Sequence, residues 1–125
     1  MKKFILFLAI FLGLICGSCA QNIQFTSLSN QEFAKVIKQK KVQLVDVRTP
    51  AEYAQGHIPH AINIDVNNNF NKQAEAKLDK KKPVAVYCAG GVRSKSAAYK
   101  LSKMEFGTIY NLKSGFDKWD GKIER

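Results

Sequence analysis

The chain of 125 residues is poor in cysteine, proline and histidine, with three, three and two of each. So few prolines among 46% hydrophobic residues exclude low-complexity disorder and a collagen-like repeat. Only Cys88 lies beyond the first twenty residues, which excludes a disulfide framework and a multi-thiolate zinc site there. The widely spaced histidines and thiol match no metal-ligand pattern, so we expect no metal and no cofactor. The length suits one domain, without repeats or linkers.

The positive charge of the chain is not accompanied by an arginine-rich stripe or an aromatic platform. Twenty Lys and Arg against ten Asp and Glu give a formal net charge of +10, which by itself suggests a nucleic acid or another anionic partner. The basic residues are scattered, however, and their longest run is the three lysines at 80–82. We interpret them as a solvated face and expect no nucleic-acid partner.

Residues 1–20 differ in composition from the rest of the chain. A short cationic start at 1–3 precedes an almost unbroken apolar run at 4–15, and small residues follow at 17–20. This order is typical of a bacterial export signal. The apolar run is shorter than the roughly twenty residues that a transmembrane helix needs, so a permanent anchor helix is not expected.

Two cleavage sites are compatible with this signal. Ser18-Cys19-Ala20 fits ordinary signal peptidase, whereas Gly17-Ser18-Cys19 resembles a lipobox, in which Cys19 would be acylated and anchor the protein to a membrane. The lipoprotein is slightly favoured, although Cys16 replaces the usual aliphatic residue. Either site leaves a domain at 21–125 that works outside the cytoplasm, in the periplasm or on the envelope. We do not interpret the C-x-x-C spacing of the two signal cysteines as a redox motif.

Two capping boxes predict where the first helices begin. Ser29 is followed by Glu32, and Thr49 by Glu52, in the S/T-x-x-E pattern that satisfies the free amides of a first helical turn. Pro50 occupies a position where its missing amide costs nothing. The second helix therefore starts directly after an apolar strand.

Alternating strands and helices make up the remainder of the domain. Short apolar runs predict strands at residues 42–47, 61–64, 84–87 and 108–110. Apolar spacing predicts further helices within 67–82 and around 97–104, and a last helical turn at 116–119. This alternation indicates an α/β fold, a parallel sheet with helices on both faces.

The loop after the most apolar strand carries the candidate chemistry. Ligands of open parallel sheets sit beyond the carboxyl ends of the strands, and Cys88 lies at such an end. Gly90 and Gly91 allow backbone amides to converge on one point, the following helix adds positive potential, and Arg93 adds a full charge. All three favour a nucleophilic thiolate and would hold an arriving anion.

These residues, taken together, resemble the rhodanese family of sulfurtransferases, specifically its single-domain members. Residues 44–53 (LVDVRTPAEY) are similar to its first signature, and 56–64 (GHIPHAINI) continue it, with His60 in place of the usual glycine. Residues 87–94 (YCAGGVRS) resemble its active-site loop, and 115–119 (GFDKW) its C-terminal signature. The four matches occur in the family's order and span the domain.

The resemblance implies a five-stranded parallel sheet and transfer of a sulfane sulfur. The donor would be thiosulfate or a persulfide, and the acceptor cyanide or a thiol. By position, Cys88 is the nucleophile that becomes a persulfide, and Arg93 binds the anionic donor. The outer sulfur would be cradled by the backbone amides of Ala89, Gly90, Gly91, Val92, Arg93 and Ser94.

Supporting residues near the loop have structural interpretations. We expect the carboxylate of Asp46, at a strand end beside the loop, to accept loop amides or to act as a cap. Arg48 and Glu52, four residues apart across a helix start, are expected to pair with each other. His57 is interpreted as a hydrogen-bonded turn residue, whereas we assign no mechanism to His60.

Two other function classes remain. Cysteine-loop phosphatases and arsenate reductases resemble this fold but use a C-x5-R loop around a tetrahedral oxyanion. Residues 88–93 form the shorter C-x4-R loop, which suits a single sulfur. A non-catalytic rhodanese-like binding module is the other class, and such a module would be expected to have lost its cysteine.

Overall fold

The computed structural model describes residues 24–125. The predictions for residues 1–20, including acylation of Cys19, fall outside this range. None of the helices between residues 24 and 125 has the length and apolarity needed to cross a membrane.

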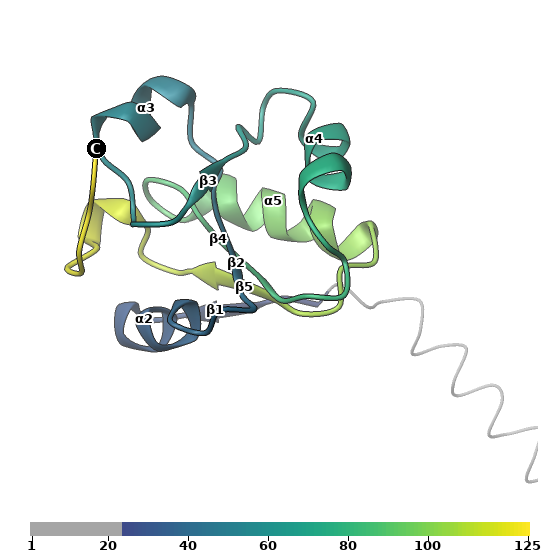
Figure 1. Ribbon diagram of the computed structural model, residues 1–125, viewed down its shortest axis with the longest axis horizontal. Helices are drawn as coiled ribbons and strands as arrows, with labels where there is room; N and C mark the ends of the chain where they lie inside the picture. Colours follow the sequence, from purple (N-terminus) through teal and green to yellow (C-terminus); the bar gives the residue numbers. More distant parts are fainter. Residues whose placement is uncertain (1–23) are drawn as a thin grey trace, which may run out of the picture.

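A five-stranded parallel sheet forms the centre of the molecule, in the order β1-β5-β4-β2-β3 (Figure 1). Its strands are β1 (Thr26–Leu28), β2 (Gln43–Asp46), β3 (Ile62–Asn63), β4 (Val84–Tyr87) and β5 (Ile109–Leu112). The α/β fold is thus confirmed. Sequence patterns predict four of these strands, and the fifth, β1, is a short edge strand that is mostly exposed and pairs with β5.

The helices connect these strands on both faces of the sheet. They are α2 (Asn30–Ile37), α3 (Pro50–Gln55), α4 (Phe70–Lys77), α5 (Val92–Lys103) and a 3-10 turn at Phe116–Lys118. Both predicted capping boxes are present, at Ser29 and Thr49. The helix predicted within 67–82 is shorter than that range, because Asn69 has a left-handed backbone (φ 48°) and Leu78 is extended.

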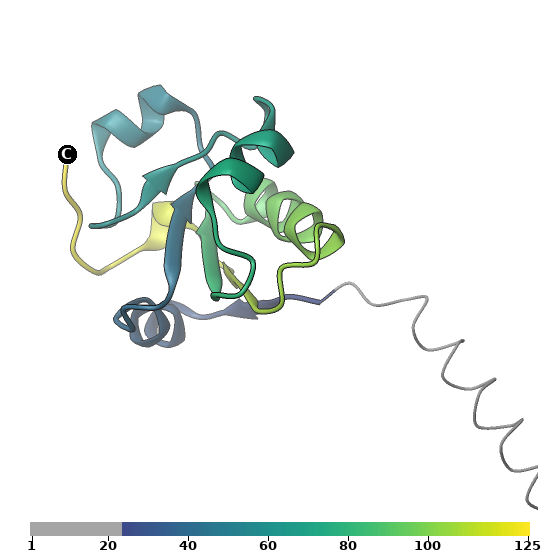
Figure 2. The same ribbon diagram turned by 45° about the vertical axis from the view of Figure 1, so that its right-hand side comes forward.

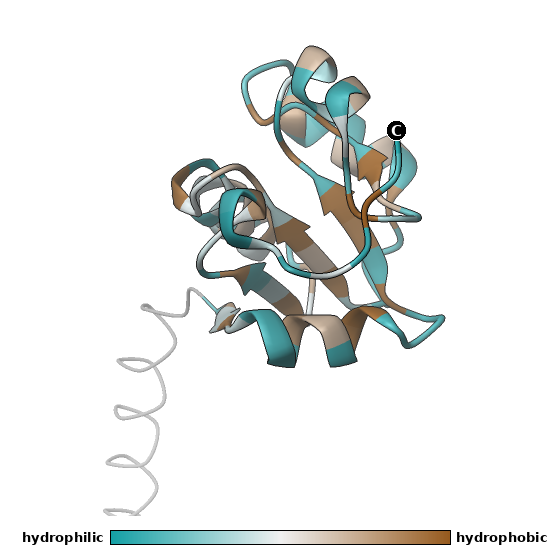
Figure 3. Ribbon diagram, turned by 90° about the vertical axis from the view of Figure 1, so that its left-hand side faces the viewer, coloured by the Kyte–Doolittle hydropathy of each residue, from teal (hydrophilic) through white to brown (hydrophobic). Residues whose placement is uncertain are grey.

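Side-chain alternation along β4 divides the interior into two cores. Val84 and Val86 face α4 and α5, whereas Ala85 and Tyr87 face α2 and the C-terminal segment. Figure 2 shows α2 and α5 on opposite sides of the sheet, and Figure 3 shows that the most hydrophobic segments are the strands. Because β4 is buried on both faces, the elements packed on each side of the sheet fix the position of Cys88, which follows β4.

The C-terminal segment returns to α3 and closes one edge of the fold (Figure 1). His57 and Glu124 form a backbone bridge, with N–O distances of 2.9 and 2.8 Å. The ring of His57 stacks on Tyr53 at 3.8 Å between centroids, and its Nδ1 lies 2.9 Å from the carbonyl oxygen of Tyr53. His57 is therefore hydrogen-bonded, as predicted, but it lies in a β-bridge with Glu124 rather than in a turn.

Candidate active site

Cys88 directly follows β4, and its side chain lies at the start of α5. The residue is only 1% exposed. Its Sγ accepts a hydrogen bond from the Gly91 amide at 3.0 Å, and the thiol donates to Ser94 Oγ at 3.4 Å. Ser94 in turn donates to the Gly91 carbonyl oxygen at 3.2 Å. The sulfur thus lies on polar groups of the helix N-terminus, where a negative charge is stabilised.

The two glycines of the loop have different roles. Gly91 caps α5 with a φ of 99°, and a Cβ there would lie 2.4 Å from the carbonyl oxygen of Lys113. Only glycine fits that conformation and that approach. Gly90 is exposed, and a Cβ on it would meet open space. Val92 is likewise exposed, whereas Ala89 is half-buried. Convergence of the loop amides on an outer sulfur stays a prediction.

The segment after β5 holds the loop from the other side. The amide of Phe116 donates to the Cys88 carbonyl oxygen at 2.8 Å, and the amide of Asp117 donates to that of Ala89 at 3.0 Å. Gly115 has a φ of 80°, and a Cβ on it would lie 2.2 Å from the Ala89 carbonyl oxygen. The glycine of the last sequence signature is therefore part of the active-site architecture, a role that the sequence reasoning missed.

Asp46 and Arg48 form a buried ion pair, which corrects two predictions. Arg48 Nη2 lies 2.7 Å from Asp46 Oδ2, and the backbone amide of Arg48 donates to Asp46 Oδ1 at 2.9 Å. Arg48 also donates to the Gly56 carbonyl oxygen at 2.7 Å. Asp46 therefore binds Arg48 rather than amides of the 88–94 loop, and the expected pair of Arg48 with Glu52 is wrong. Burial is the largest single effect and opposes the positive charge, but the hydrogen bond to Asp46 and the attraction of nearby negative groups together outweigh it and raise the pKa of Arg48.

Glu52 pairs with Arg93 of the loop instead. Two parallel contacts join them, Oε1 to Nη1 at 2.8 Å and Oε2 to Nη2 at 3.0 Å. The same carboxylate closes the capping box by accepting from the Thr49 amide at 3.0 Å. The hydrogen bond from Arg93 lowers the pKa of Glu52 to about 2, even though partial burial opposes the shift. Arg93, which the sequence predicts to bind the anionic donor, is thus already paired with a carboxylate.

An open pocket of about 310 Å³ adjoins the loop at Ala89. This loop pocket is lined by Arg48, Glu52, Gln55, Gly56, Ala89, Phe116 and Asp117. The guanidinium carbon of Arg48 lies 4.2 Å from the centroid of the Phe116 ring. The loop pocket brings together the carboxyl ends of β2 and β4 and the segment after β5. Within residues 24–125, His, Cys, Asp and Glu side chains do not form a group of three or more that could hold a metal ion.

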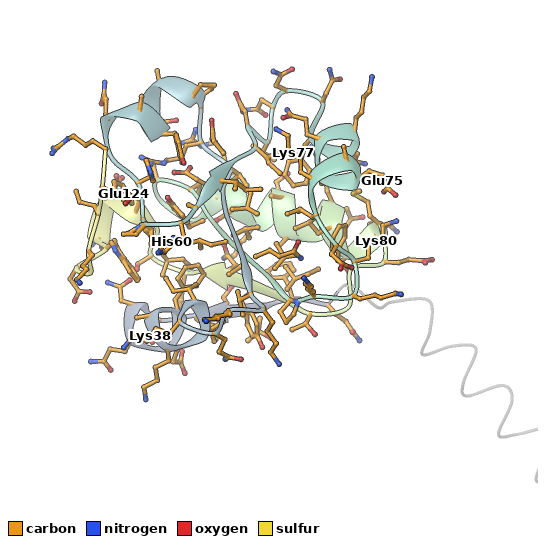
Figure 4. The ribbon with its side chains drawn as sticks, in the orientation of Figure 1. Lys38, His60, Glu75, Lys77, Lys80 and Glu124 are labelled. Atoms are coloured by element: carbon orange, nitrogen blue, oxygen red, sulfur yellow. The ribbon has the colours of Figure 1, made fainter. Side chains whose placement is uncertain are left out.

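His60 lies away from the loop pocket, on the face that carries α2. It lines a separate pocket of about 570 Å³ together with Lys38, Pro59 and Trp119. Figure 4 shows the labelled side chains of His60 and Lys38 on this face. The φ of His60 is 73°, in the region that favours glycine, so its position explains why the family usually has glycine there. It contacts none of the loop residues that the site uses.

Comparisons with known proteins agree with this architecture. Residues 29–122 match the protein family described as "Rhodanese-like domain". The uncharacterized protein YqhL of Bacillus subtilis is 40% identical over 120 residues, covering 96% of this chain and 92% of that protein. Thiosulfate sulfurtransferase GlpE of Coxiella burnetii is 31% identical over 97 residues, covering 78% and 89%.

A solved structure shows the same fold. The crystal structure of a rhodanese-like domain protein from Staphylococcus aureus superposes with a TM-score of 0.69 at 31% identity. The match covers 80% of this chain and 97% of the other. The family match, which spans most of the described residues, and the shared five-stranded sheet lead to one conclusion. The chain belongs to the rhodanese-like domain family.

Proposed function

We propose that this protein is a sulfurtransferase that carries a sulfane sulfur as a persulfide on Cys88. The observation that supports this most directly is the position of Sγ, which accepts the Gly91 amide at the N-terminus of α5. An amide donor and a helix N-terminus favour negative charge, and the thiolate is the nucleophilic form of a cysteine. The similarity to proteins named thiosulfate sulfurtransferase supports the same reaction class.

The reaction follows as two displacements at sulfur. The Cys88 thiolate attacks the outer sulfur of the donor, a new S–S bond forms, and the donor's own bond to that sulfur breaks. With thiosulfate, sulfite leaves with the electron pair. An acceptor thiolate or cyanide then attacks the outer sulfur of the persulfide, and the Cys88 thiolate leaves. No general base is needed for an ionised thiol, and ping-pong kinetics are expected.

Export of the domain is a separate proposal. It rests on the cationic, apolar and small-residue segments of residues 1–20. Intact mass spectrometry of protein from its native envelope tests it. Acyl chains on Cys19 would identify a lipoprotein, whereas a start at Gln21 would identify ordinary cleavage. A chain that retains residues 1–20 would refute the proposal.

Mass spectrometry of the full chain with a sulfur donor tests the sulfurtransferase reaction. Wild-type protein should gain one sulfur atom, and cyanide should remove it with release of thiocyanate. Cys88→Ser should gain none and keep its thermal unfolding temperature, whereas Ser96→Ala, an exposed position in α5, should load normally. Undiminished turnover by Cys88→Ser would refute the proposal. Hydrolysis of p-nitrophenyl phosphate without sulfur transfer would assign the site to the phosphatase class instead.

A further inference from the structure

The loop pocket has a charge opposite to that of the protein as a whole. Without Lys2 and Lys3, eighteen basic and ten acidic residues leave the chain strongly positive. The charged side chains that line the loop pocket are those of Arg48, Glu52 and Asp117. Carboxylates therefore outnumber cations where a substrate would approach Ala89 and the neighbouring cysteine.

Arg93 is already neutralised by Glu52. The two side chains face each other through two parallel contacts, and each is about one-third exposed. The capping box fixes the carboxylate, because Glu52 Oε1 also accepts from the amide and the hydroxyl of Thr49. An anionic donor that binds Arg93 must therefore displace a fixed carboxylate or lie beside it.

Arg48 offers no alternative anion site. It is 5% exposed, and its guanidinium donates to Asp46 and to the Gly56 carbonyl oxygen. Asp46 itself is fully buried, so it cannot be drawn away to free Arg48 without exposing an unpaired buried charge. Arg48, which lines the loop pocket, and Arg93, which contacts the lining residue Glu52, are thus both paired with carboxylates.

Asp117 adds a carboxylate that no cation pairs with within residues 24–125. Its backbone amide donates to the Ala89 carbonyl oxygen, and the residue lines the loop pocket. The residue is exposed, and its carboxylate forms no ion pair or hydrogen bond within residues 24–125. The two arginine–carboxylate pairs are each neutral, so the unpaired carboxylate of Asp117 gives these five side chains together a net negative charge.

We infer that Glu52 and Asp117 select sulfur compounds by charge, and that the site takes neutral or cationic thiols and their persulfides in preference to dianions such as thiosulfate. This inference rests on the proposed sulfur transfer. Glu52 is the specificity-determining residue, because its carboxylate neutralises the Arg93 cation that would otherwise attract an anion. One extra unit charge about 5 Å away in a partly exposed site changes a rate by roughly tenfold.

A charge series of acceptors tests the inference in the full chain. The persulfide on Cys88 is loaded with excess polysulfide and discharged by 2-mercaptoethylamine, 2-mercaptoethanol or 2-mercaptoethanesulfonate, which differ mainly in the charge of the tail. Each second-order rate constant is divided by that of the same thiol with a small disulfide, which removes intrinsic reactivity. In wild-type protein the normalised rate should fall by about tenfold for each unit of tail charge, and so by about a hundredfold from the cationic to the anionic thiol.

Matched variants identify the residues responsible. Glu52→Gln should raise the normalised rate of the anionic thiol, divided by that of the neutral thiol, and the rate of loading by thiosulfate about tenfold. Asp117→Asn should act in the same direction by a smaller factor. Glu105→Gln removes the same charge from an exposed position after α5, at the amino ends of the strands. It should leave the ratios of the normalised rates unchanged.

Two results would overturn the inference. One is a wild-type rate that does not depend on tail charge, and the other is a response of Glu52→Gln and Asp117→Asn no larger than that of Glu105→Gln. Both can occur in a protein that transfers sulfur normally. If wild-type protein gains no sulfur on Cys88 at all, the proposed function fails, and the inference fails with it.

Discussion

Replacing Gly115 by alanine tests whether the segment after β5 shapes the active-site loop. The new Cβ would lie 2.2 Å from the Ala89 carbonyl oxygen and 2.8 Å from Gly90 Cα, and both neighbours are backbone atoms that cannot rotate away. Gly115 has a φ of 80° and a ψ of 177°, a region essentially restricted to glycine, where alanine costs about 1–3 kcal/mol, and the overpacking adds about 1–3 kcal/mol. We therefore expect Gly115→Ala to lower the free energy of unfolding by about 2–6 kcal/mol.

Thermal unfolding and persulfide loading together measure this effect. For a domain of this size, 1 kcal/mol corresponds to roughly 4–8 °C, so the unfolding temperature should fall by about 10 °C or more. Loading of Cys88 should slow even below that temperature, because the 89–90 backbone must move. Gly107→Ala is the control, since a Cβ at that position meets nothing within 4 Å. Equal stability and loading in the two variants would refute the reasoning.

Three further predictions concern the groups around the loop. Arg48→Met should lower the free energy of unfolding in urea by about 3–5 kcal/mol, because the carboxylate of Asp46 stays buried without its cation; a loss under about 1 kcal/mol would contradict this. Tyr87→Phe should cost about 1–3 kcal/mol in the same assay, because the buried Ile58 amide loses the phenol oxygen that accepts its hydrogen bond at 3.0 Å; an unchanged urea midpoint would show that another group accepts it. Glu52 has a pKa lowered to about 2, so its ion pair stabilises the fold fully above the ordinary value of 4.5 and is lost as pH falls toward 2. The advantage of wild type over Glu52→Gln, about 1 kcal/mol or less for such a partly exposed pair, should therefore shrink over that pH range, and an advantage that grew would be inconsistent with the pair.

Local signals in the sequence predict much of this fold. The capping boxes at Ser29 and Thr49 involve residues three positions apart, so the sequence alone reveals them. The apolar run before Cys88 likewise indicates a buried strand with a thiol at its carboxyl end. The edge strand β1 escapes prediction because its three residues, Thr26–Leu28, are mostly exposed and carry no alternating pattern.

The ion pairs near the loop depend on three-dimensional adjacency. Helical spacing suggests a pair of Arg48 and Glu52, but Arg48 lies before the helix and turns back to the buried Asp46. Glu52 is then free to meet Arg93, which is 41 positions away. That contact exists because β2 and β4 are neighbours in the sheet and each is followed by a helix. Predicting the contact between Glu52 and Arg93 would have required the order of the strands, which a single sequence does not contain.

All strands of this sheet are parallel, so their amino ends lie on one side of the molecule and their carboxyl ends on the other. The described chain begins near the amino ends of the strands, where the Gln24 amide donates to Ser102 near the end of α5. Cys88, in contrast, lies at the carboxyl ends of the strands. In Figure 1 the entry point and the loop before α5 are at opposite sides of the molecule. A tether, an affinity tag or a fused protein joined ahead of residue 24 would consequently lie away from the active-site loop and would not obstruct the approach of a bulky macromolecular donor to it.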